Sequence, residues 1–281
     1  MNTKQRIRAE LDDLESRGQL RELKMTRGVD FSSNDYLGLA GDPRLKLAVL
    51  EAVGSSSRIS STGSRLLSGH DEAWTNLESD FARWIGAEAS LYFTSGYAAN
   101  LGLLSTILRP EDVVFSDSAN HASLIDGMRL TKSRRVVFPH LDLNALEGEL
   151  RWSASGSGSR FIVVESIFSM NGDTAPLREL AALAMRYKAE LIVDEAHATG
   201  VCGPQGRGRI AEEGLAGRVF ATVHTCGKAL AAAGAFVCGS ELLRKLLINR
   251  ARSFVFNTAF PPSFAAQVAA GIQLAAAGEP E

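Results

Sequence analysis

Short apolar runs alternate with helical patterns along most of the chain, and this alternation limits the fold more than any other feature. Seven runs have the length and composition of strands: 91–93, 113–116, 135–138, 161–165, 191–194, 219–224 and 235–238. Helical patterns lie between most of them, near 97–108, 120–131, 142–150 and 176–188. Strands that alternate with helices form right-handed crossover units. The sequence therefore predicts an α/β fold with a mainly parallel, seven-stranded sheet flanked by helices.

Helical spacing also predicts elements at both ends of the chain, over 4–24, 43–53, 70–85, 241–252 and 262–276. Residues 30–39 are rich in turn formers, and the Ser- and Gly-rich residues 55–69 fit a flexible linker as well as a structured loop. We expect three parts, which are a helix and arm over 1–40, a large ligand-binding domain over 41–262, and the start of a truncated C-terminal domain over 263–281.

Composition narrows the class of protein. The formal net charge is −2 without a basic stripe, which argues against nucleic acid as a partner. Three cysteines without a CxxC spacing argue against a disulfide framework or a zinc site, and the five histidines lack metal-ligand spacing. The first ten residues lack the apolar region of a signal peptide, and no apolar run reaches membrane-spanning length. We therefore expect a cytoplasmic protein without a metal or a membrane anchor.

Polar residues follow five of the expected strands. These segments are 94–97, 117–121, 165–169, 194–197 and 225–228. In an open, mainly parallel sheet, ligands bind beyond the carboxyl ends of the strands. We therefore expect the five segments to converge on one crevice.

Lys228 is the most informative residue of these segments. It follows an apolar run and stands among small, uncharged residues, with no carboxylate within several positions on either side. Such surroundings disfavour the charged form of an ammonium, and a neutral amine suits imine formation with an aldehyde cofactor. The alternative is a surface lysine that opens a helix.

A second segment supports the functional interpretation. Asp194 ends an apolar strand, where a buried anion is costly unless a cation or hydrogen-bond donors pair with it. A protonated heteroaromatic nitrogen would be such a partner, and His197 could bond a phenolic oxygen on the same ring. Asp194 as a helix N-cap is the alternative.

Three further residues suggest a flat, phosphorylated ligand. Gly96 begins a helix after a strand, where free backbone N–H groups favour a phosphate. Thr225 could place a hydroxyl on that phosphate or pack in its strand, and His121 could stack on a ring or be packed or solvated. Together with Lys228 and Asp194, these residues specify pyridoxal 5′-phosphate (PLP), whose protonated ring accepts electrons from a carbanion.

Motifs of other enzyme classes are missing. The run 194–197, Asp-Glu-Ala-His, matches the acidic box of some helicases, but no GxxxxGK[ST] precedes it. No GxSxG elbow indicates a hydrolase, and no GxGxxG follows the first strand as a dinucleotide fold requires.

Seven stretches resemble the α-oxoamine synthases, a family of PLP enzymes of fold type I. They are FSSNDYLGL (31–39), GSRLLSG (63–69), FTSGYAAN (93–100), NHASLIDG (120–127), ESIFSMNGDTAPL (165–177), DEAHATG (194–200) and TCGKAL (225–230). FSSNDYLGL is most similar to the members of this family that act in biotin synthesis, rather than to the glycine acetyltransferases or the aminolevulinate and sphingoid-base enzymes. The resemblance implies a PLP-dependent acyltransferase that condenses L-alanine with a pimeloyl thioester and releases CO2.

The resemblance also implies catalytic roles for four residues. Lys228 would carry the cofactor and move protons during the reaction. Asp194 would pair with the pyridine nitrogen, and His197 would bind the ring hydroxyl. His121 would stack on the ring and lie near the substrate.

Further roles follow from the same resemblance. The amides of Gly96 and Tyr97 and the hydroxyl of Thr225 would bind the phosphate, and Ser169 would lie near a cofactor oxygen. In a homodimer, Asn257 and Thr258 would reach the site of the second chain. Arg21 and Asn34 would lie near the substrate. The family carries a C-terminal domain with an arginine for the substrate carboxylate, so we expect this chain to be a fragment.

Overall fold

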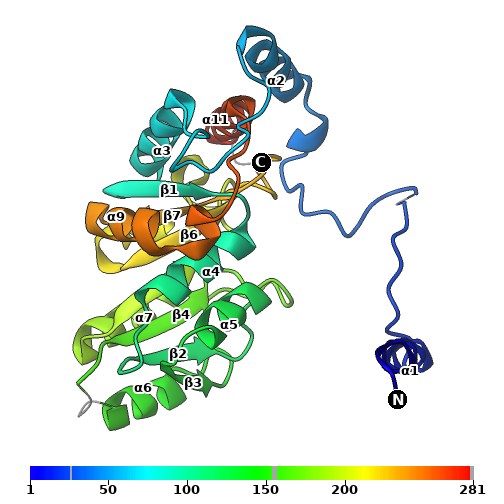
Figure 1. The fold of residues 1–281 in the computed structure, drawn as a ribbon. Coiled ribbons are helices and arrows are strands. Elements are labelled where there is room, and N and C mark those ends of the chain that lie inside the picture. Colours follow the sequence, from blue (N-terminus) through cyan, green and yellow to red (C-terminus); the bar gives the residue numbers. More distant parts are fainter. Residues whose placement is uncertain (26, 154–156, 279–281) are drawn as a thin grey trace. The chain divides into compact units, whose positions relative to one another are not determined.

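A computed structural model describes residues 1–25, 27–153 and 157–278, and it divides into two units, residues 1–33 and 34–281 (Figure 1). The first unit contains α1 (Thr3–Ser16), which begins with a capping box between Asn2 and Gln5. The prediction of a helix to residue 24 is wrong. The helix ends at Ser16 because Gly18 adopts a left-handed φ of 65°, a common helix stop.

A seven-stranded sheet forms the centre of the second unit. Its strands are β1 (Ala89–Phe93), β2 (Val113–Asp117), β3 (Arg134–Phe138), β4 (Arg160–Glu165), β5 (Glu190–Asp194), β6 (Ala221–Thr225) and β7 (Ala235–Gly239). They lie in the order β1-β7-β6-β5-β4-β2-β3, and β7 is antiparallel to both of its neighbours while the other pairs are parallel. The predicted mainly parallel sheet is confirmed.

Helices follow most strands, as predicted. They are α2 (Pro43–Ser55), α3 (Glu72–Ile85), α4 (Gly96–Ile107), α5 (Ala122–Arg129), α6 (Leu143–Trp152), α7 (Leu177–Tyr187), α8 (Arg209–Glu212), α9 (Glu241–Arg250), α10 (Arg252–Val255) and α11 (Pro262–Ala277). Short 3-10 turns occupy η1 (Leu39–Gly41), η3 (Pro204–Gly206) and η4 (Ala216–Arg218). Within the described part of the chain, no helix is both long enough and apolar enough to cross a bilayer.

The helices cover both faces of the sheet. Successive residues of a strand point to opposite faces, so Ile192 packs in the core beneath α4, α5 and α9, while Leu191 and Val193 pack beneath α6 and α7. A third core joins α3 and α11 to β1 and β7, and there the rings of Phe81 and Phe236 stack with centroids 3.7 Å apart. Figure 1 shows α3 and α11 together near the β1 edge and α6 at the β3 edge.

The strand register brings polar residues to one end of the sheet. Glu165 at the end of β4 lies opposite Asp194 at the end of β5, and Asp194 lies opposite Val223 in β6. Because these strands are parallel and end at the same level, the segments that follow them share one side of the molecule.

We expect the stacked pair of Phe81 and Phe236 to contribute strongly to the free energy of unfolding. Phe236→Ala removes a fully buried ring and should lower the free energy of unfolding by about 3–5 kcal/mol. Phe256→Ala is the matched control because this ring is 72% exposed, and its cost should stay below about 1 kcal/mol. Denaturant unfolding followed by circular dichroism measures both, and equal losses would contradict the described core.

Candidate active site

A cleft of about 310 Å³ lies beyond the carboxyl ends of the strands. Eight residues predicted for a site line it: Asn34, Gly96, Tyr97, His121, Asp194, His197, Thr225 and Lys228. A larger hollow of about 460 Å³ lies elsewhere on the surface, beside the starts of β5 and β6, but its lining contains no lysine, arginine or histidine. Basic side chains therefore line the smaller cleft and not this hollow.

Lys228 begins a chain of hydrogen bonds in this cleft. Its Nζ lies 2.8 Å from Nε2 of His197, whose Nδ1 lies 2.7 Å from the hydroxyl of Tyr36. The Tyr36 hydroxyl donates to Oδ1 of Asn34 at 3.0 Å, so it is free to accept from His197. These partners favour the neutral His197 tautomer that carries its proton on Nδ1.

Burial shifts the pKa values of both basic groups downward. It lowers the pKa of the Lys228 amine, against the opposing effect of Asp194 and Glu165. Burial and the neighbouring ammonium of Lys228 together lower the pKa of His197 to about 4. Near neutral pH, the imidazole of His197 is therefore neutral.

Asp194 is buried at the end of β5 and is fixed by two neutral donors. Its Oδ1 accepts from the Ala196 amide at 2.9 Å, and its Oδ2 accepts from Nδ2 of Asn100 at 2.6 Å. The same Nδ2 lies 2.9 Å from the hydroxyl of Ser123. No helix begins at Asp194, so the N-cap alternative is wrong. The carboxylate is held in place while its charge remains available to a cation in the cleft.

Glu165 lies in the segment 165–169 that the sequence places at the crevice, but the sequence analysis gave it no role of its own. Its Oε1 accepts from the His121 amide at 2.5 Å, and its Oε2 accepts from the Ser169 amide at 3.3 Å. Burial and the neighbouring Asp194 raise the pKa of Glu165 to about 7. The signal was present, because Glu165 ends an apolar strand just as Asp194 does.

The N-terminus of α4 forms a second end of the cleft. Ser95 caps the helix by accepting from the Ala98 amide at 3.0 Å. A Cβ on Gly96 would lie 2.5 Å from Cγ2 of Thr225, so only glycine lets the turn approach β6 this closely. The remaining N–H groups of this first turn have no partners within the helix, so they could bind an anion. The Tyr97 hydroxyl donates to Asp126 on α5.

Four predicted residues lie outside this cleft or cannot be placed against it. Ser169 contributes its amide to Glu165 but does not line the cleft. Asn257 and Thr258 line a small neighbouring cavity, where Nδ2 of Asn257 donates to Oγ1 of Thr94 at 2.7 Å. Arg21 belongs to the unit of residues 1–33, and its role stays a prediction.

The donor set fits a phosphorylated pyridine aldehyde. Gly96 and Thr225 approach closely, so the first turn of α4 and the Thr225 hydroxyl lie at the same end of the cleft, where they could bind a phosphate together. The charge of Asp194 suits a protonated ring nitrogen, and the Lys228 amine of lowered pKa suits an aldehyde.

Comparisons with known proteins agree with this arrangement. The sequence pattern of the family "aminotransferase class I and II" matches residues 26–279. An 8-amino-7-oxononanoate synthase from Lysinibacillus sphaericus is 42% identical over 96% of this chain and 72% of its own length. One from Burkholderia thailandensis is 46% identical over 89% of this chain and 64% of its own length. A solved structure of a serine palmitoyltransferase from S. paucimobilis, with a bound PLP–myriocin aldimine, matches this chain with a TM-score of 0.88 at 28% identity. The match covers 96% of this chain and 71% of the palmitoyltransferase chain.

The low pKa of His197 leads to a test by NMR. In the protein without added ligand, His197 should titrate near pH 4, whereas an exposed histidine titrates near 6.5. Lys228→Met removes a neighbouring cation, so the imidazolium becomes easier to form and the pKa of His197 should rise. Histidine ring chemical shifts across pH 3–8 measure this.

His224 supplies the internal control. It is fully buried between the hydroxyls of Thr199 and Thr222, and burial lowers its pKa to about 3 independently of Lys228. Its titration should therefore be the same in both proteins. A His197 pKa near 6.5 in the unmodified chain would contradict the described cleft.

Proposed function

Because this chain belongs to the aminotransferase class I and II family, and within it to the α-oxoamine synthases, we propose that it condenses L-alanine with a pimeloyl thioester to form 8-amino-7-oxononanoate for biotin synthesis. The main support is the placement of Lys228 and Asp194 in one cleft. The relatives named for this product are 42% and 46% identical to the chain. PLP is the cofactor of this family of acyltransferases.

PLP supplies, when bound, a protonated pyridine ring that accepts the electron pair left on the α-carbon of the amino acid. Asp194 would hold the proton on the ring nitrogen, and the donors Asn100 and Ala196 keep its carboxylate oriented. The first turn of α4 and the hydroxyl of Thr225 would bind the phosphate.

Lys228 would move protons at the reacting carbon. Because burial lowers the pKa of its amine, more of the neutral form is present near neutral pH, and only this form accepts a proton. His197 stays neutral beside it and would bind the ring hydroxyl, while Tyr36 fixes the imidazole tautomer.

Glu165 would position His121 at the wall of the cleft. Its carboxyl group accepts from the amide of His121 and holds this residue at the wall of the cleft. From that position the imidazole of His121 would stack on the ring. With a pKa of about 7, Glu165 is partly protonated at neutral pH, which limits repulsion with Asp194.

A second candidate is a related condensation with L-serine and a long acyl thioester, which the serine palmitoyltransferase of TM-score 0.88 favours. The chain spans 64% and 72% of the two synthases described above, so a cofactor-binding chain that needs a further chain for turnover is the non-catalytic alternative. We further propose that the protein is a cytoplasmic homodimer in which Asn257 and Thr258 reach the partner's cleft. We also propose that the chain divides after residues 40 and 262 into the three parts expected from the sequence.

The cofactor proposal predicts a spectroscopic result. Adding PLP to the purified chain should produce a visible absorption band that borohydride removes, because the Lys228 amine reacts with the aldehyde. Lys228→Ala should show no such band. The proposal fails if the unmodified chain shows no band, or if the variant shows the same one.

The substrate proposal predicts a preference among substrate pairs. L-Alanine with pimeloyl-CoA should release CO2 and form the amino ketone at least about tenfold faster than L-serine with palmitoyl-CoA or glycine with acetyl-CoA. The opposite preference would favour the second candidate. A protein that binds PLP but turns over none of the pairs supports the non-catalytic alternative.

A further inference from the structure

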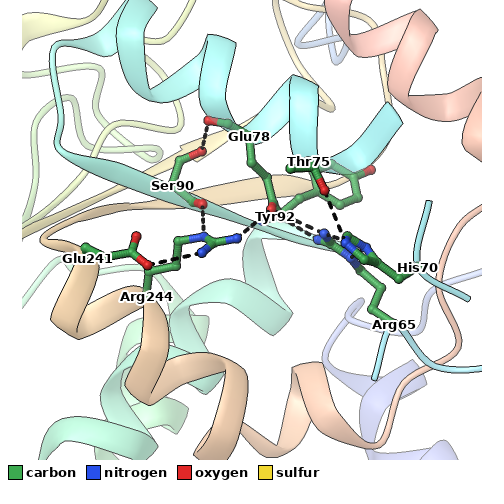
Figure 2. Close-up of polar contacts among 8 residues, drawn as sticks. All are labelled: Arg65, His70, Thr75, Glu78, Ser90, Tyr92, Glu241 and Arg244. Carbon is green, nitrogen blue, oxygen red and sulfur yellow. Dashed lines mark hydrogen bonds and ion pairs between the residues drawn. The ribbon is translucent and has the colours of Figure 1, made fainter. Parts of the chain in front are cut away.

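A buried ion pair joins α3 to the loop that precedes it. Glu78 is almost fully buried, with 3% of its side chain exposed, and Figure 2 shows it between Arg65 and Arg244. Arg65 Nη1 donates to Oε1 of Glu78, and Arg65 Nη2 donates to Oε2 at 3.2 Å. The guanidinium therefore binds the carboxylate in a bidentate manner. Arg244 is a weaker partner, at 3.5 Å from Oε2. Glu78 also accepts from the amide of Tyr92 on the edge strand β1 at 2.9 Å.

Arg65 belongs to a loop that is tied to a distant part of the sequence. The loop covers residues 61–69, and the Ala259 amide donates to the Gly63 carbonyl at 2.9 Å. Ser61 Oγ donates to the Phe260 carbonyl at 2.6 Å, and Ser64 forms a β-bridge with Thr258. The loop therefore holds residues 258–260 along its length.

The segment held by this loop touches the predicted phosphate site. Asn257 Nδ2 donates to Oγ1 of Thr94, which directly precedes the Ser95 cap of α4. Ser253 Oγ donates to the Ala98 carbonyl in the first turn of α4 at 2.6 Å. The Arg65 guanidinium also lies 5.5 Å from the ring centroid of Phe254 in the same segment.

We propose that Arg65 is a positioning residue for the phosphate end of the cofactor. Through Glu78 it anchors the 61–69 loop, which holds residues 258–260, while Arg65 itself lies over Phe254. The segment 253–260 in turn fixes the turn from Thr94 into α4. The proposal rests on the proposed PLP site, and it adds a residue that lies outside the cleft lining.

A general structural role is the competing explanation, because a buried carboxylate left without its partner destabilises a fold. The two explanations differ in their dependence on phosphate. Pyridoxal shares the ring and the aldehyde of PLP but lacks the phosphate, so only the positioning role weakens PLP binding and spares pyridoxal.

The experiment measures dissociation constants for PLP and for pyridoxal by absorption titration in Arg65→Met and in the unmodified chain. We expect the PLP constant to rise about tenfold, the size of the contribution of a helix N-terminus to a bound dianion, and the pyridoxal constant to change less than about twofold. Arg244→Met is the matched control. This variant also loses a contact with Glu78, but Arg244 does not hold the 61–69 loop. The variant should therefore leave the ratio of the two dissociation constants unchanged.

A second variant protects the test against unfolding. Arg65→Met with Glu78→Gln removes both charges of the pair and keeps an acceptor for the Tyr92 amide, and circular dichroism verifies its fold. It should show the same phosphate-specific loss. Equal weakening of both ligands, or an unchanged PLP constant in a folded variant, would overturn the proposal. An unmodified chain that binds no PLP would instead overturn the proposed function and this inference with it.

Discussion

The site depends on one costly arrangement, a carboxylate buried at the end of a central strand. Asp194 ends β5, between β4 and β6, where water is largely excluded. The fold offers it two neutral donors, from Asn100 and Ala196, which orient the anion without cancelling its charge. An anion kept in this way stabilises a cation brought by a ligand, and this is what a protonated pyridine ring requires.

The sheet order explains why the other groups meet this carboxylate. Lys228 lies in the connection from β6, the direct neighbour of β5, to the antiparallel β7. The α4 turn follows the edge strand β1, which runs in the same direction as β6 with β7 between them, and Gly96 lets this turn approach Thr225 at the end of β6 closely. The segment 253–260 lies against this same turn. The amine, the carboxylate and the anion site thus come from segments that are far apart in the sequence.

Much of this arrangement could be predicted from the sequence, because the signals are local. Each strand is a short apolar run, and Asp194 and Lys228 stand out because polar residues follow such runs. The resemblance added roles that isolated residues could not support. The end of α1 was misplaced because the helical pattern continues past Gly18, where the backbone turns to a left-handed conformation.

Other groups could not be predicted because their significance arises only from contacts over long sequence distances. Tyr36 meets His197 across 161 residues, and Asn100 meets Asp194 across 94. The pairing of Arg65 with Glu78 is not visible in the sequence, because only the folded chain buries the two side chains together. Tyr36, Asn100 and Arg65 stand in stretches that resemble the family, but the contacts that give them a role appear only in the tertiary structure.

The most direct test of the central claim is the protonation state of the ring nitrogen. The ¹⁵N chemical shift of labelled PLP bound to the protein should report a protonated nitrogen at neutral pH, because the buried charge of Asp194 stabilises the pyridinium. In Asp194→Ala, the shift should move to that of an unprotonated pyridine. An unprotonated nitrogen in the unmodified protein, or the same shift in both proteins, would contradict the account.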